Sequence, residues 1–133
     1  MTVKPTVALI AHDGKKDELL AWASFNKNTL KNFHLIATGT TGTLIEKELH
    51  TPVTLMNSGP KGGDLQIGSR AVEGDVDILI FFWDPLSAQP HDVDVKALLR
   101  IAVLENIPTA TNRATADHII SSPLNKYSKA AQN

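Results

Sequence analysis

Two short apolar runs constrain the fold of this chain more than any other feature. Residues 6–11 (TVALIA) and 78–82 (ILIFF) are almost wholly apolar, and a polar loop follows each of them. Runs of this length are too short for a buried helix and are typical of strands that are buried on both faces of a parallel sheet. We therefore expect a parallel sheet with helices packed against both sides.

Strand and helix patterns alternate along the rest of the chain. Three further strands are predicted over residues 34–38, 53–56 and 108–111. Apolar residues at helical spacing predict helices over residues 15–26, 41–49, 64–73, 93–105 and 114–121. Such alternation is typical of α/β folds with right-handed crossovers. The predicted architecture is a three-layer, doubly wound, parallel five-stranded sheet in a single domain over residues 1–133.

Composition and charge exclude several classes of partner and site. The 133 residues carry 13 Lys and Arg against 14 Asp and Glu, so we expect no nucleic acid and no membrane as a partner. The chain has no cysteine, which excludes disulfides and thiolate sites and suits the cytoplasm. Neither a signal-peptide pattern nor an apolar stretch of about 20 residues occurs, so we expect a soluble cytoplasmic protein.

Two surface segments carry further expectations. The tail over residues 123–133 is polar, and we expect it to be loosely held. Ile101 and Leu104 add apolar surface to the predicted helix 93–105, beyond the face that should cover the sheet. That inner face is expected to consist of Val95, Leu98, Leu99, Ala102 and Val103. The surplus indicates contact with another subunit, with incidental exposure as the alternative.

Polar loops follow four of the predicted strands. In an open parallel sheet, ligands bind beyond the carboxyl ends of the strands, where loops and helix N-termini meet. The loops at such ends here are residues 12–16, 38–42, 57–64 and 83–94. We expect all four to open onto one crevice.

The loop 38–42, Thr-Gly-Thr-Thr-Gly, is a candidate phosphate site. Its hydroxyls and N–H groups precede a predicted helix, whose dipole favours negative charge. Lys16 can supply a cation, and Ser58 with Gly59 offers further donors. The alternative is that the threonines and glycines only cap a helix and form a turn.

Three further polar residues each allow two roles. Asp64 follows two glycines at the start of a predicted helix, which suits an N-cap. A carboxylate beside a phosphate site can instead act as a general base on a proton next to a carbonyl. His12 and Asp13 are equally open, either as active-site groups or as a loop histidine and a helix cap.

His91 precedes a predicted helix N-terminus, where the positive end of the dipole disfavours a charged imidazole. We expect a neutral histidine that donates to a carbonyl oxygen. Asp92 suits the N-cap and Asp94 complements the dipole, so His91 and Asp94 are the favoured site residues. No tight metal-ligand motif joins His12 and Asp13 to them, and no dinucleotide fingerprint follows the first strand, so we expect no metal and no cofactor.

Together these loops resemble those of methylglyoxal synthase. The resemblance covers nearly the whole chain, through residues 11–16, 37–42, 58–64, 81–86, 90–99, 110–112 and 114–117. It implies the sheet order 3-2-1-4-5, with the loops after the first and fourth strands at the switch point. It also implies conversion of dihydroxyacetone phosphate into methylglyoxal and inorganic phosphate without a cofactor. A homohexamer that phosphate inhibits is implied as well.

The resemblance further implies residue roles. Asp64 removes a proton from the carbon next to the ketone, and the enediol or enediolate expels phosphate. The developing charge on the substrate oxygen needs a donor, for which neutral His91 is the candidate. Asp13 and Asp94 match active-site positions and orient or tune their neighbours. The positions that match phosphate and substrate contacts are His12, Lys16, Thr38, Thr40, Thr41, Ser58 and Gly59.

The C-terminal tail departs from the family pattern. Members can end with an arginine that reaches the phosphate, whereas this tail contains only Lys126 and Lys129 as cations. A lysine in that place would lack the forked geometry of arginine, so phosphate affinity or control can differ.

Three other functions compete with the synthase. A sensing module of the same fold, like the regulatory domain of carbamoyl-phosphate synthetase, needs no proton-abstracting Asp64. A phosphoryl-accepting receiver domain needs an aspartate at the end of the third strand, where this chain has Asn57 and Ser58. An isomerase would form the same enediolate but hold the phosphate out of line for elimination. The synthase is the function we favour.

Overall fold

The centre of the fold is a sheet of five parallel strands. The computed structural model describes residues 4–57, 63–86 and 95–122. The strands are Thr6–Ala11 (β1), His34–Thr38 (β2), Val53–Met56 (β3), Ile78–Phe82 (β4) and Thr109–Ala110 (β5). They pair in the order β3-β2-β1-β4-β5, and every pairing is parallel. The predicted fold class and sheet order are confirmed.

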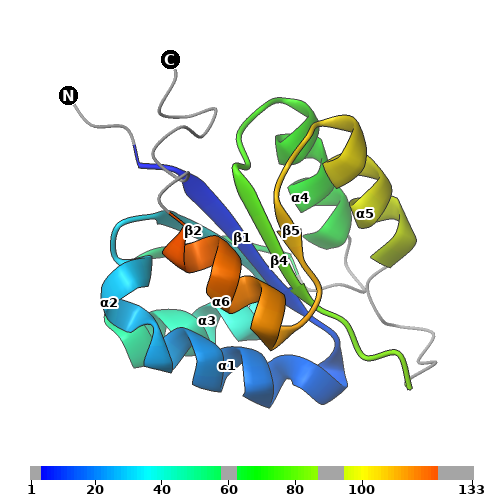
Figure 1. Ribbon diagram of the computed structural model, residues 1–133. Helices are drawn as coiled ribbons and strands as arrows, with labels where there is room; N and C mark the ends of the chain where they lie inside the picture. The colour runs from blue at the N-terminus through cyan, green and yellow to red at the C-terminus, as the bar shows by residue number, and fades with distance from the viewer. Residues whose placement is uncertain (1–3, 58–62, 87–94, 123–133) are drawn as a thin grey trace.

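Helices cover both faces of the sheet, as Figure 1 shows. One face carries α1 (Lys16–Phe25), α2 (Lys27–Leu30), α3 (Gly39–Leu49) and α6 (Arg113–Ser121). The other face carries α4 (Gly63–Val72) and α5 (Val95–Leu104). Among the described residues the longest helix, α3, has 11 residues, and none is long and apolar enough to cross a membrane.

The element boundaries lie within two residues of those predicted. The 3-10 turn η1 (Asp13–Lys15) and the single-turn helix α2 were not predicted. The start of α3 was predicted at residue 41, whereas the helix begins at Gly39. Thr38, in extended conformation, is therefore the N-cap residue of α3, and the glycine-threonine motif forms the first turn of the helix.

The strands have apolar side chains on both faces, so the fold has two hydrophobic cores. Successive side chains of a strand point to opposite faces. Val7 and Leu9 join the core beneath α1, α3 and α6, while Ala8 and Ile10 join the core beneath α4 and α5. All four are fully buried. This two-sided burial accounts for the uninterrupted apolar runs in the sequence.

Helix α5 turns a different face to the sheet than predicted. Leu98 and Ala102 are buried, and Ile101 packs against the same core. Val103 is 80% exposed, so its predicted place on the inner face is wrong, as is the surplus position given to Ile101. At about 100° per residue, Ile101 follows Leu98 on one face, whereas Val103 points about 140° away from it. Leu104 is exposed, as expected.

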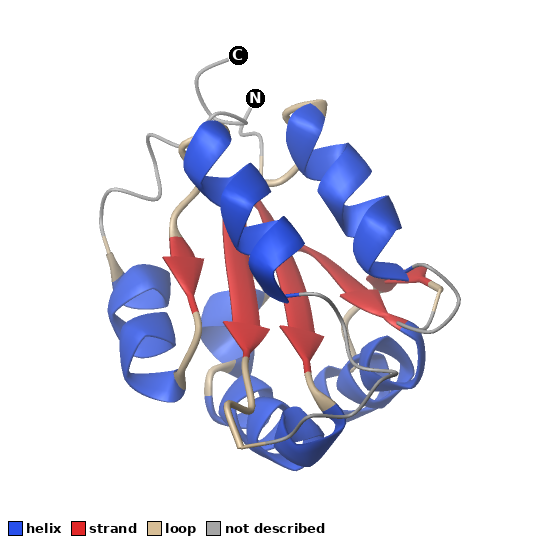
Figure 2. Cartoon of the chain, turned by 90° about the vertical axis from the view of Figure 1, so that its right-hand side faces the viewer, coloured by secondary structure: helices blue, strands red, loops and turns tan. Residues whose placement is uncertain are grey.

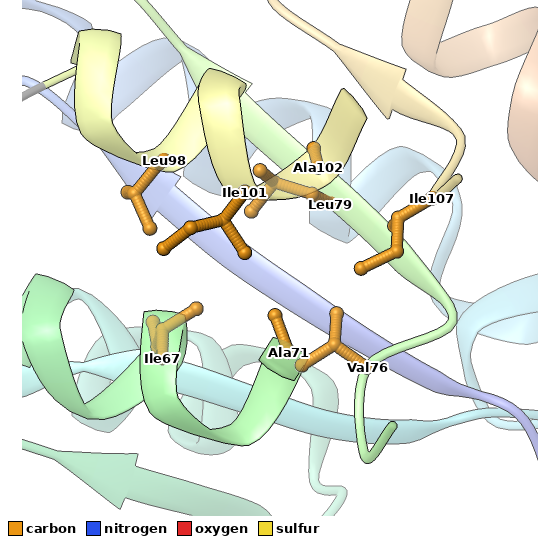
Figure 3. Close-up of a pocket in the computed structure, with 8 residues that line it drawn as sticks. All are labelled: Ile67, Ala71, Val76, Leu79, Leu98, Ile101, Ala102 and Ile107. Carbon is orange, nitrogen blue, oxygen red and sulfur yellow. The ribbon is translucent and has the colours of Figure 1, made fainter. Parts of the chain in front are cut away.

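A small apolar cavity lies between α4, α5 and the sheet (Figure 3). It holds about 10 Å³ of space, the lower limit for one water molecule. The side chains that line it are Ile67, Ala71, Val76, Leu79, Leu98, Ile101, Ala102 and Ile107. Because all of these are apolar, the cavity is a feature of core packing and offers no group that would hold a polar ligand.

Trp22 joins two helices of the first layer. The side chain is fully buried, and its Nε1 donates a hydrogen bond of 2.8 Å to Oδ1 of Asp117 on α6. The ring also contacts Phe82, with centroids 5.9 Å apart. One residue of α1 thus connects α6 and the end of β4.

Replacement of Trp22 by phenylalanine tests this connection. Trp22→Phe removes the indole donor, leaves a void and leaves Asp117 without this bond. We expect the free energy of unfolding to fall by about 1–3 kcal/mol, as measured by chemical denaturation. The exposed neighbour Ala21 offers a control, since Ala21→Ser should change that free energy by no more than about 0.5 kcal/mol. Equal effects of the two variants would contradict the connecting role of Trp22.

Candidate active site

The polar loops open at the carboxyl edge of the sheet. All strands are parallel, so their carboxyl ends meet at one edge, which Figure 2 shows as the common end of the red arrows. Pairing of β1 with both β2 and β4 places the loops that follow these three strands side by side. The described part of the site is built from these loops and from the start of α4.

His12 is held by the loop after β4. It is 5% exposed, and its backbone N–H donates to the carbonyl oxygen of Phe82 at 3.2 Å. The ring meets Phe81 edge to face, and its Nδ1 accepts a hydrogen bond of 3.0 Å from the backbone N–H of Asp84. An Nδ1 that accepts carries no proton, so the ring in this arrangement is neutral with its proton on Nε2. His12 therefore presents Nε2–H as a donor.

Asp84 is a residue of this site that the sequence analysis did not select. A Cβ atom on Gly14 would lie 2.5 Å from Oδ2 of Asp84, so the carboxylate packs directly over that glycine. The other oxygen, Oδ1, accepts from the N–H of Leu86 at 3.1 Å and forms a turn. The Asp-Pro pair at 84 and 85 signals this turn in the sequence, but its contact with the β1 loop depends on the fold.

Lys16 and Asp13 form an ion pair at the same edge. The Nζ atom of Lys16 lies 2.8 Å from Oδ1 of Asp13, one helical turn earlier. The Asp13 side chain is 70% exposed, so the pair adds little to stability. Its effect is to hold the lysine beside the loop after β1, where a cation was predicted. The N-cap position of α1 is Lys15, and no side-chain hydrogen bond caps that helix.

The threonine loop contains two buried side chains, Thr38 and Thr41. Thr38 and Thr41 are 6% and 2% exposed, whereas Thr40 is exposed. Among the described residues, Oγ1 of Thr41 has no hydrogen-bond partner. The side chain of Thr38 makes no capping bond either, which disfavours the view that this residue only caps α3. A buried hydroxyl left alone costs about 1–3 kcal/mol, so an oxygen of a bound anion is a fitting partner for Thr41.

Gly63 brings the start of α4 against the ends of β2 and β3. A Cβ atom at this position would lie 1.7 Å from the carbonyl oxygen of Asn57 and 3.0 Å from Cγ2 of Thr38. Only a glycine permits this approach. Asp64 follows directly, and because α4 begins at Gly63, Asp64 lies in the first turn of the helix and not at the N-cap position.

Part of the predicted set of site residues lies within the described part of the chain. His12, Asp13, Lys16, Thr38, Thr40 and Thr41 all lie at the carboxyl edge of the sheet, on or directly after β1 and β2. The predicted residues that fall outside the described ones are Ser58, Gly59, His91, Asp92, Asp94, Lys126 and Lys129, together with the side chain of Asp64.

Known proteins share both the sequence and the fold. A family model described as an MGS-like domain matches residues 18–111. A methylglyoxal synthase of Coxiella burnetii (strain RSA 493 / Nine Mile phase I) is 59% identical over 124 residues, which cover 93% of this chain and 86% of the relative. For that of Photorhabdus laumondii subsp. laumondii, the identity is 60% over 124 residues, which cover 93% of this chain and 82% of the relative. The crystal structure of methylglyoxal synthase from Elizabethkingia anophelis NUHP1 matches with a TM-score of 0.88 at 52% identity, covering 93% of this chain and 82% of that one.

The buried hydroxyl of Thr41 allows a test of anion binding. Thr41→Val keeps the shape of the side chain and removes the unpartnered oxygen. Without phosphate, we expect the free energy of unfolding to stay level or rise by up to about 1 kcal/mol. Affinity for inorganic phosphate should fall about tenfold or more, because a hydrogen bond to a charged group is lost. Chemical denaturation and titration calorimetry measure the two quantities.

Thr43 provides the matched control, since it is exposed on the same helix. Thr43→Val should leave phosphate affinity unchanged. If Thr41→Val bound phosphate as tightly as the unaltered protein, the buried hydroxyl would have no role in anion binding.

Proposed function

Because the chain belongs to the methylglyoxal synthase family, we propose that it converts dihydroxyacetone phosphate into methylglyoxal and inorganic phosphate. Relatives of this name are lyases, and they match the chain over most of its length. The structural observation that best supports the proposal is the buried Thr41 hydroxyl at the start of α3, which has no hydrogen-bond partner within the described part of the chain. The start of α3 lies beside the start of the helix that carries Asp64.

The phosphate end of the substrate binds at the first turn of α3. Thr38, Thr40 and Thr41 lie at that helix N-terminus, whose N–H groups and dipole favour a phosphate dianion. Lys16 adds positive charge from the neighbouring loop. Ser58 and Gly59 contribute the remaining donors in this proposal, from the loop that joins β3 to α4.

Asp64 acts as the general base. The close contact of Gly63 with Thr38 supports this role, because it brings the first turn of α4 next to the phosphate-binding helix. The carboxylate takes a proton from the carbon next to the ketone, and the electron pair of that C–H bond forms the C=C bond of an enediolate. The negative charge moves to the former ketone oxygen.

A neutral histidine stabilises that charge, and a second one binds the substrate. His91 is the proposed donor to the oxygen, and a donor already in place lowers the barrier by about 2.7–4 kcal/mol. His12 presents an Nε2–H, since its Nδ1 accepts from Asp84, and we assign it to substrate binding. Asp13 orients Lys16 through their ion pair, and Asp94 is proposed to tune its neighbours in the same way.

Elimination completes the reaction without a cofactor. The hydroxyl proton of the enediolate passes to the former ketone oxygen, so the charge then lies on the oxygen of the deprotonated carbon. Its electrons form an aldehyde carbonyl, the C=C bond shifts to the carbon that carries the phosphate, and the C–O bond to phosphate breaks. Phosphate leaves with that bonding pair and its charge is held by the threonine loop. The enol that remains takes up at its terminal carbon a proton from the Asp64 carboxyl group, gives its hydroxyl proton to the released phosphate and becomes methylglyoxal. Carbon, oxygen and phosphorus are thus conserved between the substrate and the two products.

Several finer properties are part of the proposal by family resemblance. They are assembly as a homohexamer, inhibition by inorganic phosphate and a place in the cytoplasm. The exposed Val103 and Leu104 on α5 are consistent with contact between subunits.

The reaction itself can be tested directly. Purified protein is incubated with dihydroxyacetone phosphate, with no added metal or cofactor and with a chelator present. We expect methylglyoxal and phosphate to appear in equal amounts, measured by a colorimetric assay for each. Formation of glyceraldehyde 3-phosphate in their place would identify an isomerase, and absence of any product would refute the proposed reaction.

The base role predicts a large effect at position 64. Asp64→Asn removes the proton acceptor with little change in volume, so kcat should fall at least a hundredfold while the circular dichroism spectrum is unchanged. Asp75, which is exposed beyond the end of the same helix, supplies the control. Asp75→Asn should keep kcat within about twofold. Near-normal turnover by Asp64→Asn would remove Asp64 from the role of base.

A further inference from the structure

Gln66 is an exposed residue that connects α4 to the end of β3. Its Oε1 accepts a hydrogen bond of 2.7 Å from the backbone N–H of Asn57. Asn57 is the first residue after β3, and Gln66 lies in the first half of α4. Both residues are exposed, so neither side chain is needed to fill a core. The hydrogen bond between Gln66 and Asn57 is therefore of interest for the two segments that it joins, the end of β3 and the first half of α4.

A second contact holds Asn57 from its other side. The carbonyl oxygen of Asn57 lies against Gly63, where a Cβ atom would approach it to 1.7 Å. The N–H and the C=O of Asn57 thus both contact α4, one through the side chain of Gln66 and the other through the bare Cα of Gly63. Together these contacts bring the end of β3 and the start of α4 into direct contact.

One consequence follows for the site. The first turn of α4 is fixed relative to Thr38, whose Cγ2 lies at the same contact. Asp64 is the next residue in that turn. The hydrogen bond between Gln66 and Asn57 lies outside the core and still helps to fix the position of Asp64, the proposed base.

We propose that Gln66 is a positioning residue for the reaction: by accepting the Asn57 N–H, it fixes the start of α4 against the ends of β2 and β3 and so aligns Asp64. The inference rests on the function proposed above. Gln66 does not touch the substrate in this role, and its effect passes through the backbone of Asn57 and Gly63. Loss of alignment should lower kcat more than it raises KM, since the phosphate contacts at Thr38 and Thr41 stay in place.

Two substitutions separate the acceptor from the bulk of the side chain. Gln66→Met keeps the length of the side chain and removes the oxygen, whereas Gln66→Glu keeps an oxygen that accepts. For Gln66→Met we expect kcat to fall about tenfold, equivalent to about 1.4 kcal/mol in the activation barrier, with KM within about threefold of the unaltered protein. For Gln66→Glu we expect kcat within about threefold, and a raised KM because its negative charge repels the substrate phosphate.

Gln66 and Ser69 both line an open groove between α4 and β3, and Ser69 is exposed. Ser69 therefore provides the control for a change on this helix face. Ser69→Ala should keep both kcat and KM. The melting temperature of Gln66→Met should stay within about 3 °C of the unaltered protein, so that a fall in kcat is not a loss of fold. If the unaltered protein is active and the kcat of Gln66→Met lies within twofold of its kcat, the positioning role of Gln66 is overturned while the proposed function stands. Equal loss of kcat in Gln66→Met and Gln66→Glu would also overturn it. An unaltered protein without activity would overturn the proposed function and this inference with it.

Discussion

The parallel pairing of β1 with both β2 and β4 is the arrangement on which the candidate site depends. Leu9 pairs with Ala37 on one side of β1, and Ala11 pairs with Phe82 on the other. The pairing continues one residue beyond β1, because the N–H of His12 donates to the carbonyl of Phe82. A backbone hydrogen bond of the sheet therefore positions His12, the first polar residue after the apolar strand β1, in the site. Burial of both sheet faces keeps these strands, and with them the loops, in fixed register.

Much of the fold could be predicted because its signals are local. The apolar runs of β1 and β4 identify buried strands without any knowledge of their neighbours. The inner face of α5 was harder to assign. Apolar residues occur on all sides of that helix, and the sequence does not indicate which of them pack against the sheet. Packing selected Ile101 and left Val103 exposed.

The site divides in the same way between local and tertiary signals. Threonines and glycines at a strand end, and the lysine of the preceding loop, are visible as motifs, and resemblance to a family supplies their roles. Contacts of Asp84 with His12 and of Gln66 with Asn57 join segments that are 72 and 9 residues apart. No pattern in the chain predicts such pairs, because only the fold brings the two partners of each hydrogen bond together.

The two edges of the sheet are short. β5 has two residues and β3 has four, so each offers little backbone to a strand from another molecule. Long unpaired edge strands invite strand addition and aggregation, and a sheet with brief edges is protected from both. Copies of this chain that associate would therefore meet through side chains on helix surfaces. Contacts between helix surfaces need no backbone hydrogen bonds between copies. The short edge strands therefore allow assembly through helices while they disfavour fibril formation through strands.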